Sequence, residues 1–176
     1  AHWNAGCRTA VHNLSIQRNA IKAGTGTALS NPRVQLNKAT GFIDAGFVYG
    51  HSAHRASLLR TFSGGKLHAD KNGLPRNSWN HFMAGHGRVI QSFQRLTGDP
   101  RGNENPGLLA VTGLWVLEHN RLCDELAEAN PSWSDTELFD EARKRVIALV
   151  QHVTVSEYIP VLIGEPLSAY PGYDPG

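Results

Sequence analysis

An arginine and a glutamate stand three residues apart in a stretch crowded with glycine, proline and asparagine. Arg101 and Glu104 lie in GDPRGNENPG, which runs from 98 to 107. One interpretation is that a rigid turn holds the Arg101 and Glu104 side chains against another group. The simpler interpretation is a tight turn before a helix, in which Asp99 bonds to nearby backbone and Glu104 favours the helix N-terminus. From the residues alone, the turn interpretation ranks first.

A second stretch places oxygen donors at alternate residues. In ATGFIDAGFVYG, residues 39–50, the donors are the Thr40 hydroxyl, the Phe42 carbonyl and the Asp44 carboxylate. Such alternation can wrap a calcium ion, which binds about six to eight oxygens. A single acidic side chain in a turn is more often a turn residue, so the spacing alone leaves both interpretations open.

The remaining reactive side chains match no catalytic or zinc motif. The chain has nine histidines and two cysteines, but no HExxH, zinc-finger spacing, GxSxG, P-loop or GxGxxG. His119 lies beside Glu118 on the most periodic helix, so we expect a hydrogen-bonded core or interface histidine. Cys123 falls inside the same apolar pattern, and we expect a buried free thiol there.

Length and composition indicate one soluble globular unit. The chain has 176 residues, of which 40% are hydrophobic and 18% charged, and its net charge is +2. That charge is too small to argue for a nucleic-acid partner, and no stretch approaches the roughly 18 apolar residues of a membrane span. The first residue is alanine and the last segment, YPGYDPG, is loop-like. We therefore expect an internal piece of a longer protein, forming part of one domain over 1–176 with no second domain.

Helical periodicity is strongest in the second half of the chain and predicts a mainly α fold. A long helix with Pro106 in its first turn should end near Asn130, which precedes a proline. Ser134 and Glu137 form a predicted capping box for a second helix, which Pro160 should kink or end. The two would make an antiparallel hairpin. Their expected apolar faces are Leu108, Val111, Trp115, Leu122 and Leu126 on the first helix, and Leu138, Ala142, Val146, Leu149, Val150 and Val153 on the second.

The first half of the chain carries weaker signals. Residues 1–36 show no long periodic pattern, and repeated glycines argue against a regular helix through 37–50. One short helix is expected over 52–62, with Ser52 as its N-cap. Its apolar face would consist of Ala56, Leu59 and Phe62.

Three stretches taken together resemble the animal-type haem peroxidase family. NPRVQLNKATGFIDAGFVYG is similar to the family's calcium-loop segment, and GDPRGNENPGLLAVTGLWVLEHNRL is similar to its distal arginine motif and the following helix. NPSWSDTELFDEARKRVIALVQHVTVSEYIPVLIG is similar to the next helix, and order and spacing agree over 31–173. Within the family, LLRTFSGGKL, ARKRVI and LSAYPGYDPG most resemble the peroxidase-like domain of dual oxidases, whereas LWVLEHNRLCDEL also resembles the fatty-acid oxygenase branch.

The resemblance implies roles for individual residues. Arg101 matches the distal arginine, which acts on peroxide at the haem, so it is the expected catalytic and cofactor-binding residue. Glu104 matches the carboxylate at the haem edge, which is ester-linked to a haem methyl in several members. Asn105 stands where one branch has a haem-bonded methionine, so that linkage is not expected. The implied calcium positions are Thr40, Phe42, Asp44 and Gly46, the last of which stands where the family usually has serine.

The function implied by the resemblance is that of a haem-dependent peroxidase, with haem b and calcium as cofactors and a role in the response to oxidative stress. Its partners would be hydrogen peroxide and a halide, thiocyanate or phenolic reductant. The family's distal and proximal histidines lie outside this chain, so we expect the segment alone to be inactive. Two alternatives stay open: a non-catalytic peroxidase-homology module of a dual-oxidase-like protein, and a haem fatty-acid dioxygenase. The expected location is secreted or on the extracellular face of a membrane, reached only through modules outside this chain.

Overall fold

Helices dominate the part of the chain that the computed structural model describes, namely residues 21–37, 39–78, 81, 83 and 94–172. Those residues contain isolated β-bridges but no β-strand, so the predicted mainly α class is confirmed. The elements are α1 (Gly46–Tyr49), α2 (Ala53–Leu59), the 3-10 helix η2 (Pro100–Asn103), α3 (Pro106–Ala129), α4 (Asp135–His152), the π-helix η3 (Val153–Tyr158) and α5 (Ile159–Ile163).

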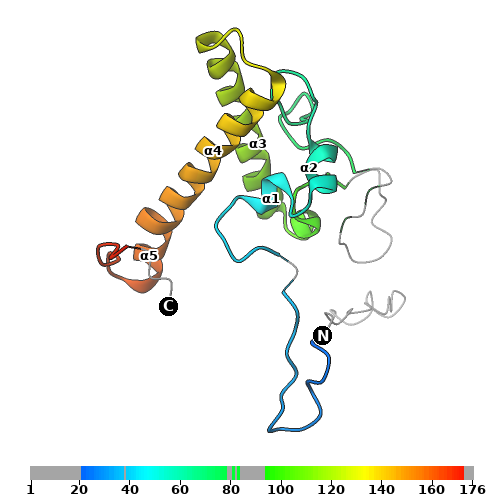
Figure 1. Ribbon diagram of the computed structural model, residues 1–176, viewed down its shortest axis with the longest axis vertical. Coiled ribbons are helices and arrows are strands. Elements are labelled where there is room, and N and C mark those ends of the chain that lie inside the picture. The colour runs from blue at the N-terminus through cyan, green and yellow to red at the C-terminus, as the bar shows by residue number, and fades with distance from the viewer. Residues whose placement is uncertain (1–20, 38, 79–80, 82, 84–93, 173–176) are drawn as a thin grey trace, which may run out of the picture.

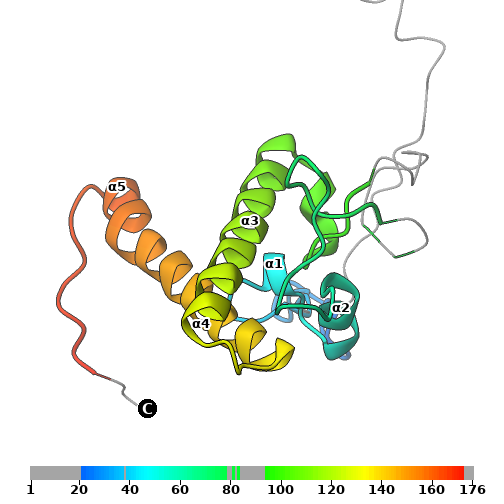
Figure 2. The same cartoon turned by 90° about the horizontal axis from the view of Figure 1, so that it is seen from above.

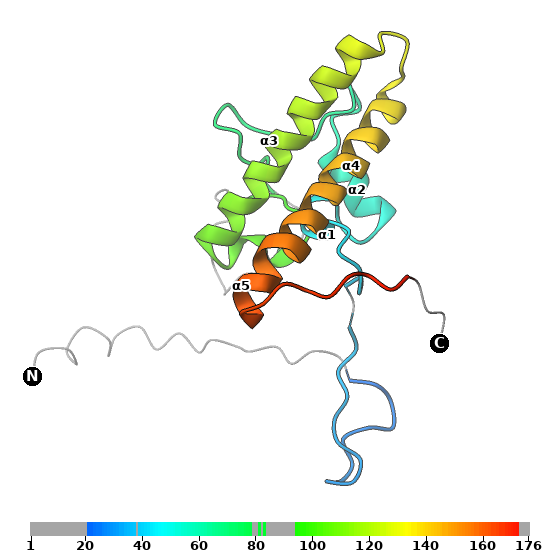
Figure 3. The same cartoon turned by 90° about the vertical axis from the view of Figure 1, so that its left-hand side faces the viewer.

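Two long helices, α3 and α4, form the predicted antiparallel hairpin (Figures 1 and 3). α3 follows the N-cap Asn105, whose side-chain oxygen accepts a hydrogen bond from the Gly107 N–H at 2.7 Å. α4 begins with the predicted capping box: the Ser134 hydroxyl accepts from the Glu137 N–H, and the Glu137 carboxylate accepts from the Ser134 N–H. Both helices therefore start where local sequence signals place them.

The buried face of α3 differs from the predicted one in its first half, where Leu108 and Val111 are exposed. The buried residues of the helix are Thr112, Gly113, Val116, His119, Leu122, Cys123 and Leu126. Thr112 and His119 are polar, so a prediction based on apolar periodicity does not place them on the buried face. Both find hydrogen-bond partners inside the protein, since the Thr112 hydroxyl donates to the Leu108 carbonyl at 2.8 Å and His119 bonds across the core. Their burial is tolerated for that reason.

The second helical run changes type along its length. α4 buries Leu138, Phe139, Ala142, Val146 and Val150, whereas the predicted face residues Leu149 and Val153 are exposed. Beyond His152 the helix widens into η3 before it continues as α5, with Pro160 in the first turn of α5. A proline lacks the N–H of a helical hydrogen bond and crowds the turn before it, which suits a wider turn at that point. Pro160 was predicted to kink or end the helix. The helix does not end there, but it takes the wider π form directly before the turn that contains the proline.

The same run, from Asp135 to Ile163, is long and apolar enough to cross a membrane by length and composition alone. It has 29 residues, and an 18-residue window of it has a mean hydropathy of 1.6 and is 6% buried. The sequence-based expectation that no stretch approaches such apolarity is therefore wrong for this run. Polar residues such as Gln151 and Ser156 interrupt the apolar ones without lowering the average below that of a span.

Two short helices lie beside the hairpin, and α5 lies on the far side of it from α2 (Figure 2). The predicted N-cap of α2 is confirmed, because the Ser52 hydroxyl accepts from the Arg55 N–H at 3.1 Å. Phe62 lies outside this helix with a φ of 57° and is exposed, so it does not share a face with the buried Leu59. Residues 21–37 extend away from the helices as an arm (Figure 3).

Candidate functional site

The turn that precedes α3 is fixed by its own backbone and side chains. Asp99 caps η2, because its Oδ1 accepts a hydrogen bond from the Arg101 N–H at 2.8 Å. The Glu104 N–H donates to the Arg101 carbonyl at 2.9 Å and closes the turn. Gly102 packs against Thr97, since a Cβ at Gly102 would lie 2.2 Å from the Thr97 hydroxyl oxygen. The predicted turn, with Asp99 bonded to nearby backbone, is confirmed.

The Arg101 guanidinium is held by Asp99 rather than by Glu104. Its Nε donates to Asp99 Oδ1 at 2.9 Å and its Nη2 donates to Asp99 Oδ2 at 2.6 Å, which makes a two-point ion pair. Hydrogen bonds from Arg101 lower the pKa of Asp99 to about 2, against the opposing effect of burial. The Arg101 side chain is 62% exposed and that of Asp99 only 14%. The guanidinium is thus anchored on one side and keeps N–H groups free at the surface.

Glu104 is exposed at the C-terminal end of η2. Within the part of the chain that the structure describes, its carboxylate has no hydrogen bond or ion pair. Arg101 and Glu104 therefore lie on one stiff turn with no hydrogen bond between their side chains. The pKa of Arg101 is raised mainly by Asp99 and to a smaller extent by the charge of Glu104. Both side chains are therefore able to bind a group that lies outside the described residues.

The turn packs directly against α1, which brings the two candidate stretches together. A Cβ at Gly98 would lie 2.4 Å from the Gly46 carbonyl oxygen and 2.5 Å from the Gly50 nitrogen, so only glycine allows this approach. The Asp99 N–H also donates to the Phe47 carbonyl at 3.3 Å. The two stretches lie about 50 residues apart in the chain, and nothing in their spacing indicates the contact.

The predicted calcium loop shows the turn interactions that the simpler interpretation requires. The Thr40 hydroxyl accepts from the Phe42 N–H at 3.1 Å, and Asp44 Oδ1 accepts from the Gly46 N–H at 2.9 Å. No group of three or more His, Cys, Asp or Glu residues that could hold a metal occurs among the described residues. The loop offers one hydroxyl, one backbone carbonyl and one carboxylate, fewer than the roughly six to eight oxygens of calcium. Any ion here needs further ligands.

His51, whose i, i+3 spacing with His54 was interpreted as that of ordinary surface or loop histidines, occupies the space beside Gly46. A Cβ at Gly46 would lie 2.2 Å from His51 Cε1 and 2.6 Å from His51 Nδ1. The other ring nitrogen, Nε2, lies 3.8 Å from Asp99 Oδ2. His51 therefore contacts both candidate stretches. The glycine at residue 46 was the available signal, because the lack of a side chain there leaves the space that the His51 ring fills.

A buried polar cluster holds α1, α3 and the 60–67 loop together. His119 Nε2 lies 2.9 Å from the Gly65 carbonyl oxygen and Nδ1 lies 2.9 Å from the Tyr49 hydroxyl. A carbonyl only accepts, so Nε2 donates and Nδ1 accepts from Tyr49. Burial lowers the pKa of His119 to about 4 and raises the pKa of the neighbouring Cys123 thiol to about 12. The expectations of a hydrogen-bonded His119 and a buried free Cys123 are confirmed.

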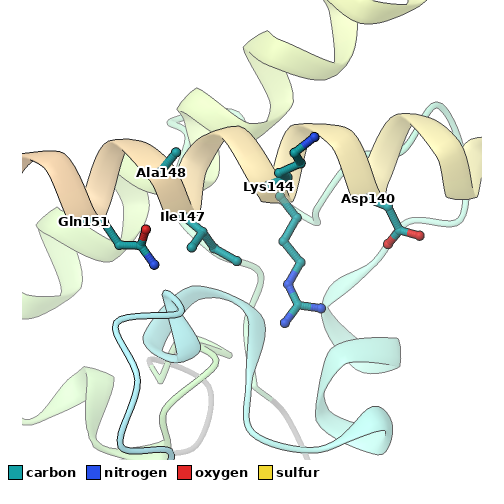
Figure 4. Close-up of a pocket in the computed structure, with 6 residues that line it drawn as sticks. Asp140, Lys144, Ile147, Ala148 and Gln151 are labelled. Carbon is teal, nitrogen blue, oxygen red and sulfur yellow. The ribbon is translucent and has the colours of Figure 1, made fainter. Parts of the chain in front are cut away.

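A groove of about 410 Å³ follows one side of α4, and no predicted site residue lines it. In Figure 4, Asp140, Ile147 and Gln151 lie on one side of the helix, and Lys144 and Ala148 on the other. The Arg143 guanidinium stacks 5.3 Å from the centre of the Tyr49 ring, and Gln151 Nε2 donates to the Ile43 carbonyl at 2.9 Å. These contacts tie α4 to α1 and to the end of the calcium loop.

Fold and site together define a class of protein. A helical hairpin is preceded by a stiff turn that presents an arginine and a glutamate, and this turn packs against a loop with alternating oxygen donors. The model of the animal haem peroxidase family matches residues 5–176. The chain therefore belongs to the animal haem peroxidase family, as its three motif stretches had indicated.

Within the family, the predicted similarity to dual oxidases is confirmed. The chain is 38% identical to dual oxidase 1 of Rattus norvegicus over 173 residues, and 38% identical to dual oxidase 2 of Homo sapiens over 169 residues. Each match covers 92% of this chain and 11% of the relative, so the chain spans about a tenth of their length.

Solved structures show the same fold. Peroxidase A from Dictyostelium discoideum matches with a TM-score of 0.76 and 30% identity, over 83% of this chain and 30% of that one. The fatty acid alpha-dioxygenase of Oryza sativa matches with a TM-score of 0.59 and 29% identity, over 76% of this chain and 19% of that one.

Proposed function

We propose that this chain supplies one wall of the haem pocket in a peroxidase, which reduces hydrogen peroxide and oxidises a halide, thiocyanate or phenolic reductant. The observation that carries the proposal is the Arg101 turn. The mostly buried Asp99 carboxylate holds the Arg101 guanidinium on one side, and the rest of the guanidinium is exposed. Glu104 is exposed next to it and has no ion pair among the described residues. Family membership supports the same assignment.

Haem b fits the donor set of this turn. Arg101 offers free N–H groups to an anion, and Glu104 offers a carboxylate that no described residue engages. When bound, the haem would supply the iron that exchanges electrons with peroxide. Glu104 would hold the porphyrin edge. An ester between Glu104 and a haem methyl would replace a methyl C–H bond by a C–O bond, with hydrogen peroxide as the two-electron oxidant that is reduced to water. These residues form part of a pocket whose other walls must come from elsewhere in the protein.

The chemical task of Arg101 follows from its charge and its anchor. A guanidinium aimed at peroxide donates hydrogen bonds to the oxygen that gains negative charge as the O–O bond breaks. Asp99 restricts the arginine to a small part of its rotamer space before peroxide arrives. Such preorganisation lowers the barrier because little reorganisation is left for the reaction itself.

A calcium ion with a structural role is part of the same proposal. Thr40, Phe42 and Asp44 supply part of a ligand set, with Gly46 contributing through its backbone. Asp44 Oδ1 bonds to the Gly46 N–H, which leaves Oδ2 for an ion. The remaining oxygens would come from other parts of the protein or from water.

The test uses the intact protein with haem bound. Arg101→Ala should slow the bimolecular reaction with hydrogen peroxide by about 10²-fold or more, because one preorganised donor is lost. Arg121→Ala is the matched control, since Arg121 is an exposed arginine of α3 whose ion-pair partners among the described residues are Glu118 and Glu125. Glu104→Gln should convert any covalently held haem into haem that acidic solvent extracts. An unchanged peroxide rate in Arg101→Ala contradicts the catalytic role.

A second candidate is a haem fatty-acid dioxygenase, supported by the similarity to the fatty acid alpha-dioxygenase of Oryza sativa at a TM-score of 0.59. Comparing fatty-acid oxygenation with halide and phenol oxidation by the intact protein separates the two. A protein without haem absorption would instead indicate a non-catalytic module. In the peroxidase proposal the domain lies outside the cell or on the extracellular face of a membrane.

A further inference from the structure

A histidine lies beside the ion pair between Asp99 and Arg101. His51 Nε2 lies 3.8 Å from Asp99 Oδ2, the same oxygen that accepts from Arg101 Nη2 at 2.6 Å. The side chains of His51 and Asp99 are 23% and 14% exposed, so the imidazole and the carboxylate shield each other from water. The carboxylate is thus enclosed by the imidazole on one side and by the guanidinium on the other.

A further arginine, Arg55, lies close enough to feel the charge of the same carboxylate. The charge of Asp99 acts on Arg55, and Arg55 Nε donates to the Gly98 carbonyl at 3.4 Å. The Asp99 N–H is fixed by the Phe47 carbonyl. Backbone and neighbours therefore determine where the carboxylate lies, and only Arg101, among its cationic neighbours, is more than half exposed.

The position of His51 depends on the absence of a side chain at residue 46. Any Cβ there would overlap the ring, at 2.2 Å from Cε1. The overlapping atoms are at the far end of a side chain that can rotate, so a methyl group at residue 46 would displace the ring and not the backbone. Asp44 Oδ1 lies 3.1 Å from the same point, which places the end of the calcium loop against the imidazole.

We propose that His51 is a positioning residue for Arg101. His51 acts by fixing the Asp99 carboxylate, and the lack of a side chain at Gly46 leaves the space in which the His51 ring lies. This inference rests on the proposed role of Arg101 toward peroxide. Through His51, the position of residues 44–46 is coupled to that of the turn that carries Arg101. A change of the loop at residue 46 is transmitted to the guanidinium through the imidazole.

The test measures the intact haem-loaded protein in two ways: the rate of reaction with hydrogen peroxide, and the affinity of the ferric haem for fluoride, followed by visible absorption. Fluoride reports the guanidinium without turnover, because an anion at the iron is stabilised by the same N–H groups. His51→Ala should weaken fluoride binding and slow the peroxide reaction by about tenfold or more, since small misplacements of a catalytic group are costly. His51→Gln, whose amide can donate to Asp99, should restore most of both.

Two glycine variants test whether the space at residue 46 determines the position of the His51 ring. Gly46→Ala should reproduce the effect of His51→Ala, and should add nothing in the His51→Ala background, because both act through one ring. Gly113→Ala is the matched control, since a Cβ at this glycine of α3 would lie 3.4 Å or more from its neighbours, an ordinary contact distance. His54→Ala is the control for loss of an exposed histidine on α2. Both controls should behave as wild type.

The outcomes separate this inference from the proposed function. If Arg101→Ala lowers the rate and the fluoride affinity but His51→Ala leaves both within about twofold of wild type, His51 has no positioning role and the proposed function stands. An effect of Gly46→Ala that persists in full without His51 also overturns the inference. If Arg101→Ala changes neither quantity, the proposed function itself fails.

Discussion

The imidazole of His119 is uncharged in the folded protein because of where it lies. It has no solvent exposure, and its two nitrogens are used by the Gly65 carbonyl and the Tyr49 hydroxyl. Cys123 Sγ approaches Nε2 at 3.5 Å and offers no negative charge, because burial raises the pKa of this thiol to about 12. Protonation of the ring would break the bond from Tyr49 and bury an unpaired charge.

This burial predicts an acid-sensitive fold. The pKa of His119 falls from 6.5 to about 4 on folding, so the unfolded chain binds the proton more readily between these values. Stability is therefore complete above pH 6.5 and is lost as the pH falls toward 4, by roughly 3 kcal/mol in total. The check is urea unfolding of the haem-free intact protein across this range. His119→Gln should be less stable at neutral pH and should lose most of the slope.

His54→Gln on α2 is the control, since His54 is exposed. It should keep the wild-type slope. An equal slope in His119→Gln and wild type would show that other groups cause the acid sensitivity.

At the same scale, sequence alone identified some residues and missed others. The Arg101 turn and its Asp99 cap were predictable, because their bonds join residues two apart. The role of His119 as a core histidine was predictable from its helix, but its partners Tyr49 and Gly65 were not. His51 was missed because its contact with Asp99 exists only after α1 and the turn have packed together.

Among the elements, the starts of helices were predicted better than their buried faces. The Ser134 capping box depends on residues three apart, and it forms as expected. The buried face of α3 was assigned wrongly in its first half, because Thr112 and His119 are buried through partners elsewhere in the chain and Leu108 is not. Local signals fix where a helix begins, whereas its packing is set by the tertiary structure.

The 60–67 loop depends on one glycine that joins α3 to α4. The Gly65 N–H donates to Asp135 Oδ1 at 2.7 Å, and its carbonyl accepts from His119. Its φ is +73°, and a Cβ would lie 2.7 Å from the Phe139 nitrogen. Two separate costs, backbone strain and overlap with α4, therefore oppose any side chain at this position.

Neighbouring Gly64 allows the two costs to be separated. Gly64 has a φ of +61°, but a Cβ there meets nothing within 4 Å. Gly64→Ala should cost about 1 kcal/mol, from strain alone. Gly65→Ala should cost several times more, about 3 kcal/mol or above, because α4 must also move. Urea unfolding of the two variants measures both, and equal losses would contradict the contact with α4.

At the scale of the whole molecule, two apolar surfaces are exposed in the part of the chain that the structure describes. On α3 these side chains are Leu108, Val111, Leu114 and Leu117, and on η3 and α5 they are Val155, Tyr158, Val161, Leu162 and Ile163. Exposed apolar surface of this extent is unusual for a free-standing domain. The chain also covers only 30% of Peroxidase A from Dictyostelium discoideum. We expect further residues of the same protein to cover both surfaces.

If further residues cover these surfaces, one substitution should have different effects on stability in the isolated 176-residue chain and in the intact protein. Leu162 is 67% exposed in the described residues. In the 176-residue chain produced by itself, Leu162→Glu should leave stability nearly unchanged and reduce self-association in sedimentation, because it adds charge to an exposed apolar surface. In the intact protein the same change should cost about 3 kcal/mol or more, since it removes a buried leucine and buries a carboxylate. Lys144→Glu, on an exposed side chain of α4, is the control and should cost little in either setting. A small effect of Leu162→Glu in the intact protein would show that α5 stays uncovered there.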